Sequence, residues 1–454
     1  MKSRREFLKQ SAATGALITT PYIWTSQYAR ARDLNSKLTV AAIGVGGSRG
    51  AFNQGGAIGR NAAKLGEMIA VCDVDDVHTA EFNKDFDGKL NMYRDYRELI
   101  EKEKPDVVTI GTPDHWHIPI SIAALRSGAD VYCEKPLTLT IQEGIDICKV
   151  VQETGRVFQV GTQQRSQNDD RFLKAIAIVQ SGRLGKNVNA YVAIGGAPTE
   201  GPFKSTPTPD GLDWDMWVGP APKADYALER RKNFRWWYEY SGGKMTDWGA
   251  HHIDIAQWAL GYDHSGPVKV RAQGKFTPNV PEKFDWDAFL EGKISLPNGF
   301  NTASEFGIDL EYENGAILSV NDHYHREGGI DFGNGILFEG EKGRIFVNRS
   351  KLQGKPIDNF TEKDIEEINE QVTKLYKGRK TGNHMQNFFE SIEDRKQPIS
   401  DVFTHHRTMT SCHLCNIGLM LGRELNWNPQ QESFVGDDQA NAFLSRASRE
   451  GFGS

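Results

Sequence analysis

The stretch KLTVAAIGVGGSRG, residues 37–50, decides the fold. Its first part is mostly apolar and rich in β-branched side chains, which predicts a buried strand. The strand passes directly into Gly44, Gly46 and Gly47. Glycines at such a turn let the backbone fold tightly and approach a pyrophosphate, which the N–H groups at the start of the next helix can hold. We therefore expect these three glycines to bind a dinucleotide.

The glycine pattern departs from the usual G-x-G-x-x-G, because Arg49 stands at its third position. Support comes from the second apolar strand, which ends in Asp73. In dinucleotide-binding folds an acid at this point accepts hydrogen bonds from the adenosine ribose. An acid at this position favours NAD, because its negative charge would repel the 2′-phosphate of NADP. Arg49 could offset this repulsion and permit NADP. The alternative is that Asp73 only caps the following segment.

Strands and helices alternate over the next hundred residues. The pattern predicts strands over 105–111, 131–135 and 157–161, with a helix over 118–127. Such alternation indicates a parallel, doubly wound sheet, whose ligands bind at the carboxyl ends of the strands. Three residues after the first of these strands are therefore expected near the nicotinamide: Thr112, Pro113 and His117.

The next strand ends in Glu134-Lys135-Pro136. Proline has no N–H to donate, so it ends the strand and leaves Glu134 and Lys135 at the ligand-binding edge. A desolvated lysine changes its pKa readily, which suits catalysis. A structural Glu–Lys pair is the alternative. The dinucleotide motif before it favours a functional lysine.

A second catalytic signal lies in SGGKMTDWGAHHID, residues 241–254. At helical spacing Asp247 and His251 are four residues apart and share one face. A carboxylate beside an imidazole fixes its tautomer and raises its basicity, which suits a general acid–base. A helix-start aspartate with a structural histidine is the alternative. Beside Lys135 we favour the functional interpretation.

In order and spacing these motifs resemble those of the glucose–fructose oxidoreductase and inositol dehydrogenase family (Gfo/Idh/MocA), over nearly all of the chain after residue 36. The resemblance implies a Rossmann domain over residues 36–160. It also implies a C-terminal α+β domain over 161–454, with a largely antiparallel sheet. One face of that sheet would be open and is often used for oligomer contacts, so we expect a homo-oligomer.

The resemblance further implies a chemistry. Lys135 and His251 would act on a hydroxyl of a sugar, sugar derivative or cyclitol, with NAD or NADP as cofactor. Asp247 would bind substrate and orient His251. Three residues are candidate substrate contacts, with core packing as the alternative: Arg165, Trp236 and Tyr238.

Two other functions stay open. One is a glycoside hydrolase that uses NAD transiently, oxidising a sugar carbon so that the aglycone can be eliminated. That branch of the superfamily commonly lacks the lysine of Glu-Lys-Pro, so Lys135 counts against it. The other is a non-catalytic sugar-binding protein on a dehydrogenase fold. The intact Lys135, Asp247 and His251 count against that.

Residues 1–31 predict export. SRREFLK at 3–9, a mildly apolar stretch at 11–23 and Ala29-Arg30-Ala31 fit a twin-arginine signal peptide with a cleavage site. We expect the twin-arginine export machinery to place the protein in the periplasm or outside the cell. That route carries folded proteins and free NAD is scarce outside the cytoplasm. We therefore expect a tightly bound cofactor that is recycled in place.

The composition fits an ordinary globular enzyme. The 454 residues carry a net charge of -6, without the basic surplus that nucleic-acid binding would need. No stretch is a convincing membrane span. The five cysteines indicate no disulfide framework, and neither Cys412-His413-Leu414-Cys415 nor the histidine pairs complete a metal-binding spacing. Residues 212–220 are expected to form a loop on the second domain, and the charged residues 351–380 a solvated excursion.

Overall fold

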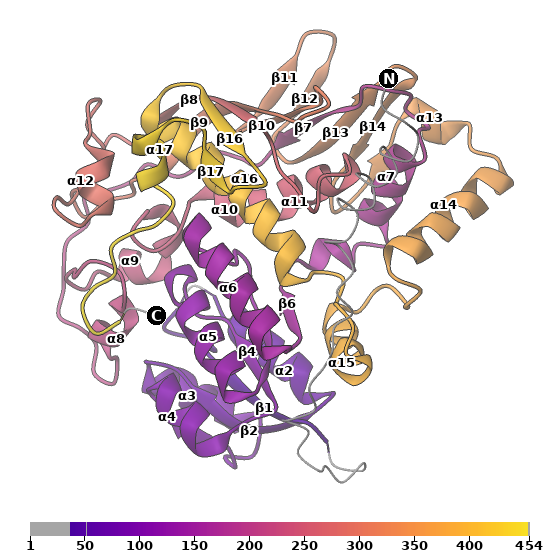
Figure 1. The fold of residues 1–454 in the computed structure, drawn as a ribbon. Coiled ribbons are helices and arrows are strands. Elements are labelled where there is room, and N and C mark those ends of the chain that lie inside the picture. Colours follow the sequence, from indigo (N-terminus) through magenta and orange to yellow (C-terminus); the bar gives the residue numbers. More distant parts are fainter. Residues whose placement is uncertain (1–36, 51, 453–454) are drawn as a thin grey trace, which may run out of the picture. The chain divides into compact units, whose positions relative to one another are not determined.

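The computed structural model describes residues 37–50 and 52–452. The first part builds a six-stranded parallel sheet in the order β3-β2-β1-β4-β5-β6 (Figure 1). Its strands are β1 (Thr39–Ile43), β2 (Glu67–Cys72), β3 (Asn91–Tyr93), β4 (Val107–Ile110), β5 (Asp130–Cys133) and β6 (Phe158–Val160). The helices between them are α2 (Gln54–Ala63), α3 (Asp76–Lys84), α4 (Tyr96–Glu103), α5 (His117–Ser127) and α6 (Ile141–Thr154). This strand order is that of the Rossmann fold and confirms the predicted fold class.

Both faces of this sheet are covered, as the near-continuous apolar strands require. Along β1, Val40 and Ala42 pack toward α2 and α3, whereas Ala41 and Ile43 pack toward α4, α5 and α6. The first face is completed by α15 (His384–Asp394), which comes from near the end of the chain and inserts Phe388. The strand order reverses between β1 and β4, and a ligand binds at such a switch point.

The rest of the chain is built around a nine-stranded sheet in the order β15-β14-β13-β7-β10-β9-β8-β16-β17. Only β7 and β10 pair in parallel, so the sheet is mostly antiparallel, as expected. The strands are β7 (Asn189–Ala193), β8 (Lys269–Phe276), β9 (Ala303–Glu311), β10 (Ile317–Asn321), β13 (Gly335–Gly340), β14 (Gly343–Val347), β15 (Leu352–Gln353), β16 (Leu425–Asn428) and β17 (Ser433–Phe434).

Three helices cover one face of the second sheet: α7 (Arg171–Gln180), α11 (Gly249–Ala259) and α16 (Val402–Leu421). The other face carries exposed Gln273, Lys275 and Glu305 along β8 and β9. Part of it is covered by the hairpin of β11 (Tyr324–Arg326) and β12 (Ile330–Phe332), whose aromatic side chains pack on the sheet. The remaining short helices are α8 (Trp214–Val218), α9 (Leu228–Lys232), α10 (Lys244–Asp247), α12 (Trp286–Leu290), α13 (Lys355–Asp358) and α17 (Asp438–Ala442).

Residues 351–380 are mostly exposed, as expected of a solvated excursion, and they contain a helix that was not predicted, α14 (Glu362–Leu375). Thr361 and Asp364 form a capping box at its start, and Ile368 and Val372 are buried on the side that packs on α7. Ile365, Ile368, Val372 and Leu375 recur at helical spacing, so the amphipathic pattern of this helix is present in the sequence. The predicted export signal at residues 1–31 lies outside the described residues. Among the described residues, no helix has the length and apolar character needed to cross a membrane.

Candidate active site

One cavity of about 510 Å³ brings together the two groups of residues that the sequence singles out. Gly44, Gly46 and Asp73 line it with the residues that follow β1 and β2. Lys135, Asp247 and His251 line the same cavity from the end of β5 and from α10 and α11. Thr112, Pro113, Glu134 and Trp236 also line it, as expected. A cofactor site and an acid–base site therefore share one space.

The turn after β1 has the backbone that its glycines allow. Gly44 and Gly46 have φ angles of 73° and 65°, in the left-handed region that favours glycine. A Cβ at Gly44 would lie 2.5 Å from the Thr112 side chain, so this glycine also permits close packing of the two loops. The N–H of Gly46 donates to Asp73 Oδ2 at 3.0 Å, which ties the turn to the end of β2.

Gly55 takes the place of the missing third glycine. The loop after β1 is longer than usual, and α2 begins only at Gln54. A Cβ on Gly55 would lie 1.9 Å from the Gly44 carbonyl oxygen, so only glycine lets α2 start this close to β1. The N–H groups of Gln54 and Gly55 lie in the first turn, whose donors have no partner within a helix. This cradle fits the pyrophosphate of a dinucleotide.

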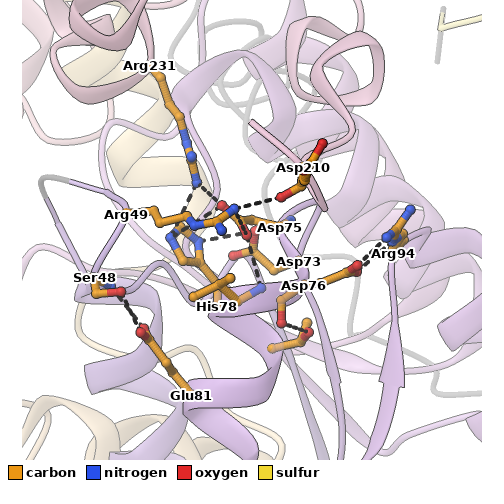
Figure 2. Close-up of polar contacts among 12 residues, drawn as sticks. Ser48, Arg49, Asp73, Asp75, Asp76, His78, Glu81, Arg94, Asp210 and Arg231 are labelled. Carbon is orange, nitrogen blue, oxygen red and sulfur yellow. Dashed lines mark hydrogen bonds and ion pairs between the residues drawn. The ribbon is translucent and has the colours of Figure 1, made fainter. Parts of the chain in front are cut away.

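Beside the glycine turn, Asp73 belongs to a polar network in which Arg49, His78 and Arg231 gather around Asp75 (Figure 2). Asp73 Oδ1 accepts from the Asp75 N–H at 3.0 Å, and His78 Nδ1 lies 3.4 Å from the same oxygen. Arg231 donates to Asp75 Oδ2 at 2.5 Å, and both side chains are almost completely buried. Arg49 donates to the Asp210 carbonyl at 2.8 Å, with its Nη1 3.6 Å from Asp75. Asp73 thus faces the cavity from a fixed position, as binding a ribose requires.

The expectation that residues 212–220 form a loop on the second domain is wrong. They contain α8, which packs together with α9 over the end of the Rossmann sheet where the dinucleotide site lies. The Trp116 indole donates to the Met216 carbonyl at 3.0 Å, and the Asp213 N–H donates to the Val74 carbonyl at 2.9 Å. Met216 and Trp217 line the cavity together with Arg231 of α9. The second half of the chain therefore forms one wall of the dinucleotide site.

At the catalytic end, Lys135 and Asp247 form an ion pair. Lys135 Nζ lies 2.6 Å from Asp247 Oδ1 and also donates to the Asp247 carbonyl at 3.1 Å. Arg235 Nε lies 3.2 Å from the same carboxylate oxygen. Burial alone would raise the pKa of Asp247, but the positive charges of Lys135 and Arg235 lower it to about 2. Asp247 is therefore ionised and holds Lys135 in the cavity.

His251 corrects the expected pairing with Asp247. Trp248, between α10 and α11, keeps helical φ and ψ angles, but no hydrogen bond joins the two side chains, and Asp247 bonds Lys135 instead. His251 is buried and its Nδ1 has no hydrogen-bond partner among the described residues. Burial, followed by the charge of Lys135, lowers its pKa well below the usual value. His251 is thus a neutral imidazole that can accept a proton.

Two buried carboxyl groups complete the site. Glu134 Oε1 accepts from Gln54 Nε2 and Gln163 Nε2, each at 3.1 Å, which links the start of α2 to the end of β5. Asp114 lines the cavity and accepts a hydrogen bond from the Ser241 hydroxyl. Burial raises the pKa of Asp114 to about 7. Sequence reasoning missed Asp114, although it directly follows Thr112-Pro113.

The chain matches two models of one family. Residues 38–162 match the model of the "Oxidoreductase family, NAD-binding Rossmann fold". Residues 198–280 and 330–454 match the model of the "Oxidoreductase family, C-terminal alpha/beta domain". The chain belongs to the Gfo/Idh/MocA oxidoreductase family. Its first domain is an NAD-binding Rossmann domain.

Relatives in this family act on sugars. The chain is 24% identical over 380 residues to D-glucoside 3-dehydrogenase of Escherichia coli, which covers 78% of this chain and 98% of that protein. It is 29% identical over 196 residues to a glycosyl hydrolase family 109 protein of Stenotrophomonas maltophilia, covering 41% of this chain and 40% of that protein. A similar fold occurs in the WlbA dehydrogenase of Bordetella pertussis, solved with NADH and UDP-GlcNAcA. That likeness has a TM-score of 0.57 at 16% identity and covers 87% of this chain and 99% of that one.

Four predicted site residues lie outside the cavity lining: Gly47, Arg165, Tyr238 and His117. Arg165 is buried with Asp254, to which its Nη2 and Nε donate at 2.6 and 2.7 Å, so its charge is already paired. Tyr238 is buried and its hydroxyl donates to Asn416 at 3.0 Å. His117 lies behind the site, with its ring nitrogens 2.6 Å from the Pro136 carbonyl and 2.9 Å from the Thr112 carbonyl. These side chains support the site without facing it.

No group of three or more described side chains is arranged to hold a metal ion. Cys412 and Cys415 are free thiols buried within α16, where burial raises the pKa of both. Their spacing therefore serves the packing of α16.

Proposed function

We propose that this protein is an NAD(P)-dependent oxidoreductase that acts on a hydroxyl of a sugar, sugar derivative or cyclitol. The observation that carries this proposal is the single cavity, in which the glycine turn and Asp73 lie with Lys135, Asp247 and His251. The family's cofactor supplies the hydride acceptor when it is bound. The protein must then manage the hydroxyl proton and the developing negative charge.

Each side chain at the catalytic end has a separate role in this reaction. His251 is the candidate acceptor of the hydroxyl proton, because it lines the cavity and burial keeps its imidazole unprotonated before the reaction. Lys135 is suited to stabilise the oxygen as the proton leaves, since a fixed cation in a water-poor site interacts strongly with developing charge. Asp247 keeps Lys135 in place through the 2.6 Å ion pair. Trp236, at the same end of the cavity, offers an aromatic face to sugar C–H groups.

A substrate screen tests this function. The purified protein with its bound cofactor is offered sugars, cyclitols and aryl glycosides while nicotinamide absorbance and products are followed. An oxidised sugar or cyclitol with reduced cofactor is the expected result. Binding without any redox change across the screen would instead favour a sugar-binding protein.

We also propose that the cofactor is held tightly and is recycled on the enzyme. The support is the wall formed by α8 and α9, where the buried Arg231–Asp75 pair joins the two halves of the chain beside Asp73. Release of the dinucleotide would require this wall to move. After extensive dialysis, retained cofactor and multiple turnovers without added NAD are expected. An apo-protein that needs a continuous supply of NAD would contradict this proposal.

The predicted twin-arginine signal explains why the protein would need to retain its cofactor. We propose that the mature protein works in the periplasm or outside the cell, where a released cofactor could not be replaced. Fractionation of cells that express the full chain should place it there. Replacing Arg4 and Arg5 by lysine should leave it in the cytoplasm.

We propose that the protein forms a homo-oligomer through the outer face of the second sheet. The support is its outer face, where Gln273, Lys275 and Glu305 are exposed and no described helix packs. Light scattering of the purified protein tests the proposal. A monomer at micromolar concentration would refute it.

A glycoside hydrolase with transient use of NAD is the second candidate, favoured by the relative in glycosyl hydrolase family 109. In that case an aryl glycoside would release its aglycone with no net reduction of the cofactor. Oxidised product without aglycone release supports the dehydrogenase.

A further inference from the structure

Two cations at the catalytic end of the cavity have no anionic partner. Lys244 and Arg349 both line the cavity near Asp247 and His251. No described carboxylate forms an ion pair with either, whereas Asp247 is already engaged by Lys135 and Arg235. Partial burial lowers the pKa of Lys244 and of Arg349, and the distant charge of Asp247 opposes this only in part. A second charge of opposite sign is missing from their surroundings.

Each of these cations lies on an aromatic ring. Lys244 Nζ is 5.5 Å from the centre of the Trp236 ring, and the Arg349 guanidinium is 4.6 Å from the centre of the Trp248 ring. Both tryptophans line the cavity. Cation–π contacts stabilise a cation but do not neutralise it. The rings hold the two charges in place and leave them available to a ligand.

The cofactor does not explain these two charges. The dinucleotide cradle is built from the glycine turn, the start of α2 and Asp73, at the ends of β1 and β2. Arg235 stacks on Phe52 of the loop after β1, with the guanidinium 4.1 Å from the ring centre, and its charge is already paired with Asp247. Lys244 lies on α10 and Arg349 follows β14, and both elements belong to the second sheet's domain.

We infer that the substrate carries an anionic group, a carboxylate or a phosphate, which Lys244 and Arg349 bind while His251 and Lys135 act on a hydroxyl. This rests on the proposed oxidoreductase function and narrows its substrate class to acidic sugars such as uronides or sugar phosphates. Lys244 is half-buried and gains most from an ionised acceptor, because charge-assisted hydrogen bonds are about twice as strong as neutral ones, whereas Arg349 is exposed and adds to the same positive charge at the cavity. A neutral glucoside would leave both cations unpaired.

The test uses the full mature protein with its bound cofactor and three probes: methyl β-D-glucoside, methyl β-D-glucuronide and glucose 6-phosphate. Binding is measured by calorimetry, and redox chemistry by nicotinamide absorbance after one addition of probe. The variants are Lys244→Met and Arg349→Gln. Arg344→Gln is the matched control, because it removes the same charge from β14 at a residue that faces Glu339.

An acidic probe is expected to bind at least about tenfold more tightly than the glucoside. This preference should fall by about tenfold in each variant, persist in Arg344→Gln, and weaken at high salt. The two acidic probes distinguish a carboxylate from a phosphate. Each variant should still retain its bound cofactor, which shows that it is folded.

Equal binding of acidic and neutral probes, with no effect of either variant, would overturn the inference. Reduction of the cofactor by the glucoside alone would overturn it too, and would leave the proposed oxidoreductase intact. Binding of an acidic probe that depends on Lys244, without redox change for any probe or any sugar in the wider screen, would support the anion site while rejecting the oxidoreductase.

Discussion

Two ion pairs, Arg165–Asp254 and Lys135–Asp247, show that a buried aspartate can serve either structure or chemistry. Arg165 and Asp254 are both at most 2% exposed, and Thr408 donates to the same carboxylate at 2.8 Å. Lys135 and Asp247 are about 15% exposed and open on the cavity. No ligand can reach the Arg165–Asp254 pair. In the Lys135–Asp247 pair, either side chain can bind a substrate in place of its partner.

Arg165→Met is therefore expected to be a stability variant. Leaving Asp254 buried without its partner should lower the free energy of unfolding by about 3–5 kcal/mol. Cofactor retention and KM of the folded fraction should match the wild type. Denaturant unfolding and steady-state kinetics measure the two effects. An Arg165→Met protein of normal stability but raised KM would restore Arg165 as a substrate contact.

Asp73 decides the choice of cofactor at the residue scale. Its carboxylate is fixed by the N–H groups of Gly46 and Asp75, each at 3.0 Å, beside the ribose end of the groove. Asp73→Ser should weaken NAD binding and relatively favour NADP, because the charge that repels a 2′-phosphate is gone. Mass spectrometry of the retained cofactor in wild type and variant measures this. Retention of NADP alone by the wild type would show that Asp73 has another role.

At the scale of elements, the start of α2 is set by one glycine. Gly55→Ala places a methyl group 1.9 Å from the Gly44 carbonyl, so α2 must move away from the glycine turn. We expect cofactor retention to fall at least about tenfold, because the N–H groups that cradle the pyrophosphate move with the helix. Gly266→Ala is the control, since its new Cβ meets only Pro429 at 3.7 Å. Equal loss of cofactor in both variants would contradict this.

The sequence predicts helices and strands more accurately than it predicts the loops and turns that join them. Apolar runs separated by helical periodicity locate five strands of the Rossmann sheet, whereas the three-residue β3 is too short to leave a pattern. The i, i+4 rule puts Asp247 and His251 on one side of the chain, and both line the cavity, but it cannot show that Asp247 pairs with Lys135, 112 residues away in sequence. Gly55 is missed because its role depends on the length of the loop before α2.

At the scale of the whole molecule, contacts between distant segments could not be predicted from local pattern. The wall of α8 and α9 depends on Arg231 meeting Asp75, 156 residues away in sequence. The partner of Arg165 is likewise set by tertiary packing. The sequence identifies Lys135, Asp247 and Asp73 because each follows a recognisable element. It cannot tell that Tyr238 points into the core, since aromatic residues occur in cores and in sugar sites alike.

Buried histidines should make the molecule sensitive to acid. Burial lowers the pKa of His115, His117, His252 and His384 to about 4, and that of His413 to about 3. The unfolded chain binds more protons than the folded one below a pH of about 6.5, so stability falls as pH drops from there toward 4.

Four buried acids act in the opposite direction. Burial raises the pKa of Asp114 and Glu143 to about 7 and also raises that of Asp130 and Glu134, and their contribution to stability is lost as pH rises through the raised pKa. Burial lowers the pKa of His251 and His405 as well, so seven buried histidines outnumber these acids. We therefore expect the free energy of unfolding to fall by more than about 3 kcal/mol between pH 7 and pH 5. Denaturant titrations at the two pH values measure it, and equal stability would show that the histidines are not held neutral.

The most direct test of the oxidoreductase proposal is the absorbance of the nicotinamide carried by the purified, dialysed protein when the substrate found in the screen is added. It is recorded for the wild type, Lys135→Ala and His251→Ala. Reduction of the cofactor is predicted in the wild type, with turnover lower by about two or more orders of magnitude in each variant. His251→Ala should still hold its cofactor. Near-wild-type rates in both variants would contradict the assignment of Lys135 and His251.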